Sequence, residues 1–192
     1  LRPLQTPHPP IWYPSSTPAS CAAIGEMGYN FVTLGAREHA KACLDGFRGG
    51  VAKRNGKPGL DASFPGGMAE GINRHIVIAD TDEKALEIAK PAYRRYHTSL
   101  AKLWRENKVQ GPAIVKDTMA DVSAGMENGS VIVGSVDTVG EELERQIDML
   151  GLNYLICDFY FGDISHGDAI GSLDRFTSSI MPKLSQMDAA AQ

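Results

Sequence analysis

The chain has 192 residues, of which 43% are hydrophobic, and its formal net charge is −4. This composition is ordinary for a soluble globular protein with one core, and the acidic balance argues against a nucleic-acid partner, whose binding surfaces are usually basic. No apolar run approaches the roughly 18 residues that a membrane-spanning helix needs, so no membrane partner is expected.

Short apolar runs alternate with helical patterns along the chain. The expected strands are 11–14, 30–34, 74–79 and 154–160, and the expected helices are 18–27, 36–52, 81–106, a helix capped by Ser135, and 165–184. Pro91 should kink or split the longest helix, because proline lacks an N–H donor. This alternation predicts an α/β fold with parallel strands and crossover helices, which both a barrel and an open doubly wound sheet fit.

Two segments, 54–72 and 107–130, lack hydrophobic periodicity and are predicted to be irregular, with one short helix around 119–126. A short extended piece follows at 131–133. We expect the highest mobility in the two irregular segments, and one of them is expected to form part of a lid over a bound ligand.

Several helix starts carry recognisable capping signals. Asp80 and Glu83 form a capping-box pattern before the long helix, and Ser165 with Asp168 forms another before the last helix. The D-x-x-H-x-D run at 163–168 has a loose spacing for metal ligands, and no second cluster supports it. Helix capping is therefore the favoured interpretation of this run, and no metal is expected.

Three hydroxyl side chains, Ser15, Ser16 and Thr17, stand between the first expected strand and Pro18. Thr17 is the expected N-cap, and Pro18 suits the first helical position. Free N–H groups and the helix dipole favour an anion at a helix start, and in a barrel the active site lies on this face. The hydroxyls therefore indicate a phosphate site, with plain helix capping as the alternative.

Aromatic residues end the last expected strand. Side chains alternate in a strand, so Phe159 and Phe161 share one face while Tyr160 opposes them. Phe159 and Phe161 could wall a substrate pocket, and packing in the hydrophobic core is the alternative.

The motifs of several other classes of protein are missing. The sequence has no G-x-G-x-x-G and no Walker A motif, which weighs against a Rossmann site or a P-loop, and no G-x-S-x-G nucleophile elbow. The three cysteines, Cys21, Cys43 and Cys157, form no CxxC pair. Their spacing argues against a zinc site or a disulfide framework and favours a cytoplasmic location.

An ordered set of short stretches resembles the luciferase-like flavin-dependent monooxygenase family, which is named for bacterial luciferase. The stretches are RPLQ (2–5), PHPPIW (7–12), GYNFV (28–32), RHIVIADTD (74–82), VGSVDTV (133–139), NYL (153–155), FYFGD (159–163), SL (172–173), Phe176 and MP (181–182). Each is weak alone, but together they span nearly the whole chain in order.

The resemblance implies a (β/α)8 barrel that binds reduced FMN, supplied by a flavin reductase, and uses O2 on a small organic substrate, commonly as a homodimer. Residues 1–192 would then be a single domain that supplies strands five to eight, the C-terminal half of the barrel. The start at Leu1 and the four-strand count fit an absent N-terminal half, and the chain alone is expected to be inactive.

In the family, the loop after the fifth strand holds the flavin phosphate, and Ser15, Ser16 and Thr17 occupy that place. Pro14 stands where some relatives carry an acidic residue. The flavin supplies the chemistry, so the resemblance assigns no catalytic residue, and basic phosphate partners are expected from the missing half. Two alternatives remain, an F420-dependent oxidoreductase of the same fold and a non-catalytic flavin-binding subunit.

Overall fold

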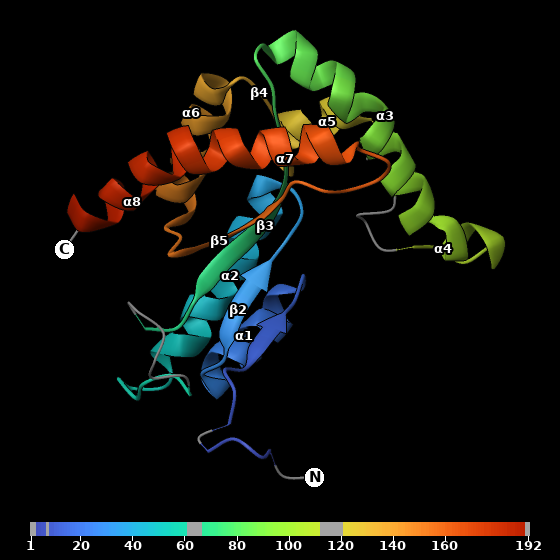
Figure 1. Ribbon diagram of the computed structural model, residues 1–192. Helices are drawn as coiled ribbons and strands as arrows, with labels where there is room; N and C mark the ends of the chain where they lie inside the picture. Colours follow the sequence, from blue (N-terminus) through green and yellow to red (C-terminus); the bar gives the residue numbers. More distant parts are fainter. Residues whose placement is uncertain (1–2, 7, 61–66, 112–120, 191–192) are drawn as a thin grey trace. The chain divides into compact units, whose positions relative to one another are not determined.

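The computed structural model of the chain describes residues 3–6, 8–60, 67–111 and 121–190 (Figure 1). The chain divides into two compact units. The first holds residues 1–73 and 150–156, and the second holds residues 74–149 and 157–192. Strands β3 (Glu70–Ile78) and β5 (Tyr154–Asp158) contribute residues to both units.

In the first unit, two strand–helix pairs precede β3. Strand β1 (Trp12–Pro14) leads into α1 (Pro18–Met27), and β2 (Asn30–Thr33) leads into α2 (Arg37–Ala52). β1 pairs in parallel with β2, and β2 pairs in parallel with the start of β3. As predicted, α1 ends at Gly28, whose φ of 79° lies in the left-handed region that favours glycine.

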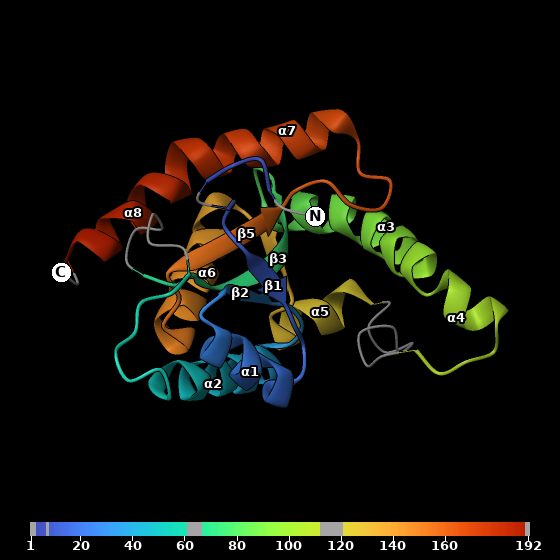
Figure 2. The same ribbon diagram turned by 90° about the horizontal axis from the view of Figure 1, so that it is seen from below.

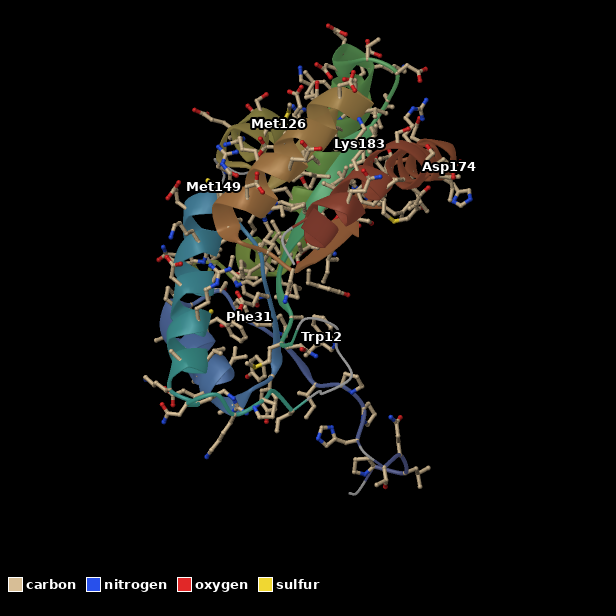
Figure 3. All side chains as sticks on the ribbon, turned by 90° about the vertical axis from the view of Figure 1, so that its left-hand side faces the viewer. Trp12, Phe31, Met126, Met149, Asp174 and Lys183 are labelled. Carbon is tan, nitrogen blue, oxygen red and sulfur yellow. The ribbon has the colours of Figure 1, made fainter. Side chains whose placement is uncertain are left out.

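The core of the first unit lies between β2 and the helices α1 and α2, which run side by side (Figures 1 and 2). Phe31 of β2, labelled in Figure 3, stacks on Phe47 of α2 with ring centroids 4.8 Å apart. The two helices approach each other at glycines, because a Cβ at Gly50 would lie 1.9 Å from the Ala22 carbonyl oxygen. The absence of a side chain there is what allows this close packing.

In the second unit, the end of β3 pairs in parallel with β4 (Val131–Gly134). Its helices are α3 (Asp82–Leu100), α4 (Lys102–Glu106), α5 (Val122–Asn128), α6 (Val136–Leu150), α7 (His166–Arg175), the π-helical turn η3 (Phe176–Ile180) and α8 (Met181–Ala190). A buried hydrophobic cluster of this unit includes Val77, Ala89, Val133, Phe161 and Ala169.

The four expected strands all form, and they pair in the predicted order. The hydrogen-bonded strand order is β1-β2-β3-β4, and β5 pairs with β3. The extended piece expected at 131–133 joins the sheet as β4, so the described residues form five strands instead of four. Parallel strands that alternate with helices confirm the predicted fold class.

Strand ends differ from the prediction at two places. β3 begins at Glu70, inside the segment expected to be irregular, because backbone pairing with β2 extends it toward the N-terminus. β5 ends at Asp158, so the aromatic run at 159–161 lies beyond the strand. The alternation of strand side chains therefore does not apply to that run.

The longest expected helix, 81–106, also differs from the prediction. It continues through Pro91 as α3 and is divided at Ala101, after which α4 begins. The N-cap is Thr81, whose hydroxyl oxygen accepts a hydrogen bond from the Lys84 N–H at 3.2 Å. The predicted capping residue, Asp80, instead pairs with Arg175 at 2.5 Å, so its carboxylate is engaged elsewhere.

The predicted cap of the last helix is confirmed. The Ser165 hydroxyl oxygen accepts a hydrogen bond from the Asp168 N–H at 3.0 Å and donates to the Asp168 carboxylate at 2.6 Å. The expected single helix 165–184 is divided into α7, the turn η3 and α8.

The two segments expected to be irregular are described in part. The short helix expected around 119–126 is α5. Residues 61–66 and 112–120 lie outside the described residues, so the mobility and the lid stay predictions. Within the described ranges, no helix is long and apolar enough to cross a bilayer.

Candidate functional site

The turn between β1 and α1 brings Ser15, Ser16 and Thr17 together at the start of α1. The Ser15 N–H donates to the carbonyl oxygen of Val32 in β2 at 3.3 Å. Because β1 and β2 are parallel, this contact holds the turn at the carboxyl ends of both strands. Ser16 and Thr17 are exposed and Ser15 is half-buried, so the hydroxyls line an accessible surface.

The start of α1 has no side-chain cap. Thr17 occupies the N-cap position with extended backbone angles, but its hydroxyl donates to the Ser20 oxygen at 2.7 Å instead of accepting from the helix. Pro18 has no N–H, and the next two amides, those of Ala19 and Ser20, receive no acceptor from Thr17. The arrangement therefore leaves backbone donors at the positive end of a ten-residue helix.

The Ser15 hydroxyl lies close to both the Thr17 amide and the thiol of Cys21. Its oxygen accepts a hydrogen bond from the Thr17 N–H at 3.4 Å. Burial, with a smaller contribution from Cys43, raises the pKa of the nearby Cys21 thiol to about 11, and the Ser15 hydroxyl partly offsets this rise. The thiol is therefore protonated at neutral pH and is no nucleophile.

His39, in the first turns of α2, reaches the same turn and was missed by the sequence analysis. Its Nε2 lies 2.8 Å from the Ser16 carbonyl oxygen and 3.7 Å from the Cys43 sulfur. The sequence did carry a signal for this contact. His39 follows a strand expected beside β1, and the segments after neighbouring parallel strands lie at the same edge of the sheet.

A buried hydroxyl lies at the carboxyl end of β2. Thr33 is 1% exposed, and its Oγ1 finds no hydrogen-bond partner among the described residues. Buried polar atoms are rarely left unpaired in native proteins. The uncapped amides of α1 and the exposed hydroxyls of Ser16 and Thr17 form a donor set that fits an anionic oxygen ligand.

Phe159 and Phe161, the predicted pocket walls, lie in different surroundings. Phe161 is 5% exposed and packs within the core of the second unit, where its ring contacts His75 and Tyr96. Phe159 is half-buried, and its ring centroid is 5.4 Å from that of Phe176. Core packing, the alternative to a pocket wall, therefore describes the surroundings of Phe161, and Phe159 keeps partial access to solvent.

An ionisable cluster within the second unit was also missed. His75 of β3 is packed against Tyr93, Tyr96 and Phe161. Its Nε2 is 3.5 Å from the Asp158 carboxylate, but the geometry is not that of a hydrogen bond. Burial lowers the pKa of His75, and the nearby Asp158 charge opposes this shift. His75 therefore stays neutral in the folded protein near pH 7.

The second unit also contains a pocket of about 250 Å³ beyond the end of β3, between the starts of α3 and α7. The ion pair of Asp80 with Arg175 lines it, together with Lys84 and Asp168. Its two acidic and two basic side chains balance, so the pocket favours neither anions nor cations. Among the residues with described structure, no group of three or more His, Cys, Asp or Glu side chains is placed to hold a metal ion.

Comparison with known proteins adds the evolutionary context. The family model described as luciferase-like monooxygenase matches residues 1–153. The uncharacterized protein y4wF of Sinorhizobium fredii (strain NBRC 101917 / NGR234) is 27% identical over 184 residues, which cover 96% of this chain and 51% of y4wF. The chain therefore spans about half the length of this curated relative.

The chain also spans about half the length of several solved structures with the same fold. Monooxygenase RslO1 from Streptomyces bottropensis matches with a TM-score of 0.71 and 18% identity, over 96% of this chain and 51% of that one. The oxygenating constituent of 3,6-diketocamphane monooxygenase from Pseudomonas putida, solved in complex with FMN, has a TM-score of 0.66 and 17% identity, over 91% and 49%.

A third match is the coenzyme F420 dependent tetrahydromethanopterin reductase from Methanopyrus kandleri, with a TM-score of 0.58 and 14% identity, over 91% of this chain and 50% of that one. At such identities these likenesses show the fold alone. The match to the family model covers well over half of the 192 residues. The chain therefore belongs to the luciferase-like monooxygenase family.

Proposed function

We propose that this chain binds the phosphate group of FMN at the start of α1, as part of a flavin-dependent monooxygenase that acts on a small organic substrate. The observation that carries the proposal is the uncapped N-terminus of α1 beside the hydroxyls of Ser15, Ser16 and Thr17. Membership of the luciferase-like monooxygenase family supports oxygen chemistry. The FMN bound in a protein of similar fold supports the choice of flavin.

The chain's own residues would bind and orient the cofactor. The Ala19 and Ser20 amides and the exposed Ser16 hydroxyl would donate to phosphate oxygens, where the α1 dipole favours negative charge. Pro14, at the end of β1, brings no carboxylate that would repel the phosphate. The activation of O2 belongs to the bound flavin, so no side chain of this chain is assigned to acid–base catalysis.

The substrate pocket is part of the same proposal. Phe159 keeps some exposure beyond the end of β5 and is the better candidate to touch the substrate. Phe161 lies within the core and is less suited to touch a substrate directly. Aromatic side chains suit an apolar organic substrate.

The assembly of the active protein is also proposed. Because the chain spans about half the length of its relatives, we expect activity to require a second half of the barrel, with further phosphate ligands. A homodimer, a flavin reductase that supplies the reduced cofactor and a cytoplasmic location are the expected setting.

Two other functions remain as alternatives. An F420-dependent oxidoreductase is favoured by the match to an F420-dependent reductase of similar fold, and the absorption spectrum of the bound cofactor would distinguish it. A non-catalytic flavin-binding subunit would bind FMN but show no oxygen-dependent turnover in the presence of a reductase.

The phosphate site is tested by the double substitution Ser15→Ala with Ser16→Ala. Loss of hydrogen bonds to a charged group should weaken FMN binding by roughly ten-fold or more. Riboflavin lacks the phosphate, so its binding should change little, whereas a general loss of folding would weaken both ligands. If the double variant binds FMN as tightly as the parent, the proposed phosphate site is wrong.

A further inference from the structure

A second structural element fixes the main chain of the turn that carries the proposed phosphate site. His39 belongs to α2, and the turn belongs to the β1–α1 connection, 23 residues earlier in the chain. The Nε2 atom of His39 is 2.8 Å from the Ser16 carbonyl oxygen. A carbonyl oxygen can only accept, so the ring nitrogen donates, and the proton of the neutral ring is on Nε2.

This hydrogen bond determines how the following peptide is oriented. In a trans peptide unit, the carbonyl oxygen of Ser16 and the N–H of Thr17 point in opposite directions. When His39 holds the Ser16 oxygen, the Thr17 N–H points away from α2, toward the Ser15 hydroxyl at 3.4 Å. The same contact binds a carbonyl oxygen whose partial negative charge would otherwise repel an anion at the turn.

The position of His39 is itself defined by the fold. The side chain starts in the first turn of α2, shortly after Gly35, which turns the chain from β2 toward the helix at a φ of 98°. A Cβ at Gly35 would lie 3.6 Å from the Cδ2 atom of His39, so the ring packs against this bend. The Cys43 sulfur, one helical turn further, lies 3.7 Å from Nε2 and closes the other side.

From these contacts we infer that His39 is a positioning residue for the phosphate of the flavin, acting through the Ser16 carbonyl and not through direct contact with the ring system. The inference rests on the proposed function of the turn. His39 would thus add a phosphate-positioning residue from a second element of this chain, beside the basic partners expected from the other half of the barrel.

The test compares His39→Leu with His39→Gln in the protein that contains this chain. Leucine removes the donor, and glutamine places an amide N–H at a reach similar to that of imidazole Nε2. His39→Leu should weaken FMN binding about five-fold, as for the loss of one hydrogen bond. Riboflavin binding should change less than two-fold, and His39→Gln should restore FMN binding to within two-fold of the parent.

Two controls keep the result interpretable. His166→Leu removes another exposed histidine, in the first turn of α7, and should leave both ligands unaffected. The double substitution of Ser15 and Ser16 reports on the phosphate site itself. If that double variant loses FMN selectively but His39→Leu does not, the positioning role is wrong and the site stands. Equal weakening of FMN and riboflavin by His39→Leu, or no rescue by glutamine, also overturns the inference.

Discussion

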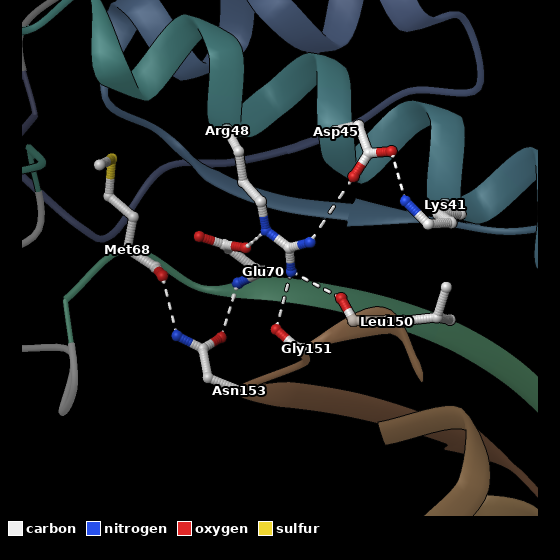
Figure 4. A network of polar contacts seen from close by, with 8 residues as sticks. All are labelled: Lys41, Asp45, Arg48, Met68, Glu70, Leu150, Gly151 and Asn153. Carbon is white, nitrogen blue, oxygen red and sulfur yellow. Dashed lines mark hydrogen bonds and ion pairs between the residues drawn. The ribbon is translucent and has the colours of Figure 1, made fainter. Parts of the chain in front are cut away.

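Arg48 of α2 and Glu70 at the start of β3 form an ion pair in which Arg48 Nε lies 2.6 Å from the Glu70 carboxylate (Figure 4). The same guanidinium donates from Nη2 to the carbonyl oxygens of Leu150 and Gly151, at 2.6 and 2.8 Å. Asn153 continues the network, since its amide donates to the Met68 carbonyl oxygen and accepts from the Glu70 N–H. These contacts connect the segment before β5 to a helix more than 100 residues earlier in the chain.

We expect Arg48→Met to lower the free energy of unfolding by roughly 1–3 kcal/mol, because two carbonyl oxygens and a carboxylate lose a charged donor. Lys41→Met is the matched control. Lys41 forms an i,i+4 pair with Asp45, and its side chain is 48% exposed, so its loss should cost only about 0.3–0.5 kcal/mol. Urea denaturation of both variants measures the difference, and equal effects would show that the Arg48 network does not stabilise the fold.

Neighbouring glycines in α2 should respond in opposite ways to alanine. A Cβ at Gly50 would meet the Ala22 carbonyl oxygen at 1.9 Å, whereas one at Gly49 would meet nothing within 4 Å. Gly50→Ala should therefore force α1 and α2 apart and cost about 1–3 kcal/mol. Gly49→Ala should stabilise the helix by roughly 0.5–1 kcal/mol. Thermal unfolding midpoints that move in the same direction for both variants would contradict the close helix contact.

The buried His75 should make stability depend on pH. Burial lowers the pKa of His75 in the folded protein, so below the usual histidine pKa of about 6.5 the unfolded chain binds a proton that the folded chain does not. The free energy of unfolding should therefore fall as the pH drops from about 7 toward 5, by at most about 1.4 kcal/mol per pH unit for this group. His75→Phe should lose less stability over the same range than the parent.

A substitution of Asp158, which lies beside His75, provides the control for this charge interaction. The Asp158 carboxylate, 3.5 Å from His75 Nε2, opposes the lowered pKa. Asp158→Asn should remove this attraction and lower the pKa of His75 further, which a histidine titration followed by NMR would record. A rise in the pKa of His75 in that variant would contradict the assigned charge interaction.

The fold was predictable from the sequence where local signals and packing agree. The run at 30–34 is rich in apolar and β-branched residues, and its first four residues become the fully buried strand β2. Ala40, Cys43, Leu44 and Phe47 recur at helical spacing and form the buried face of α2. The turn at 15–17 was predictable for the same reason, since hydroxyl residues before a proline favour a helix start.

Contacts between distant residues could not be predicted in this way. Asp80 has a good sequence signal for an N-cap, yet Arg175, 95 residues later, engages its carboxylate, and Thr81 caps α3 instead. The contact of His39 with Ser16 depends on the adjacency of β1 and β2, which no local pattern contains. Phe161 looked like a strand residue, but β5 ends earlier, and the ring lies in the core.

The two threonines at helix starts allow a last test of the candidate site. Thr17 and Thr81 both occupy N-cap positions with extended backbone angles, but only the Thr81 hydroxyl accepts from its helix. Thr81→Ala should therefore cost about 1 kcal/mol of stability, as expected for a lost cap. Thr17→Ala should cost much less, because its hydroxyl binds Ser20 and satisfies no backbone N–H of α1.

Comparison of Thr17→Ala with Thr81→Ala separates a structural role of Thr17 from a role in phosphate binding. If its hydroxyl can turn from Ser20 to a bound phosphate, Thr17→Ala should weaken FMN binding while the urea midpoint stays near that of the parent. Thr81→Ala should shift the urea midpoint and leave the affinity for FMN unchanged under native conditions. If Thr17→Ala destabilises the protein as much as Thr81→Ala does, Thr17 is an ordinary helix cap, and the amides at the start of α1 are not available to an anion.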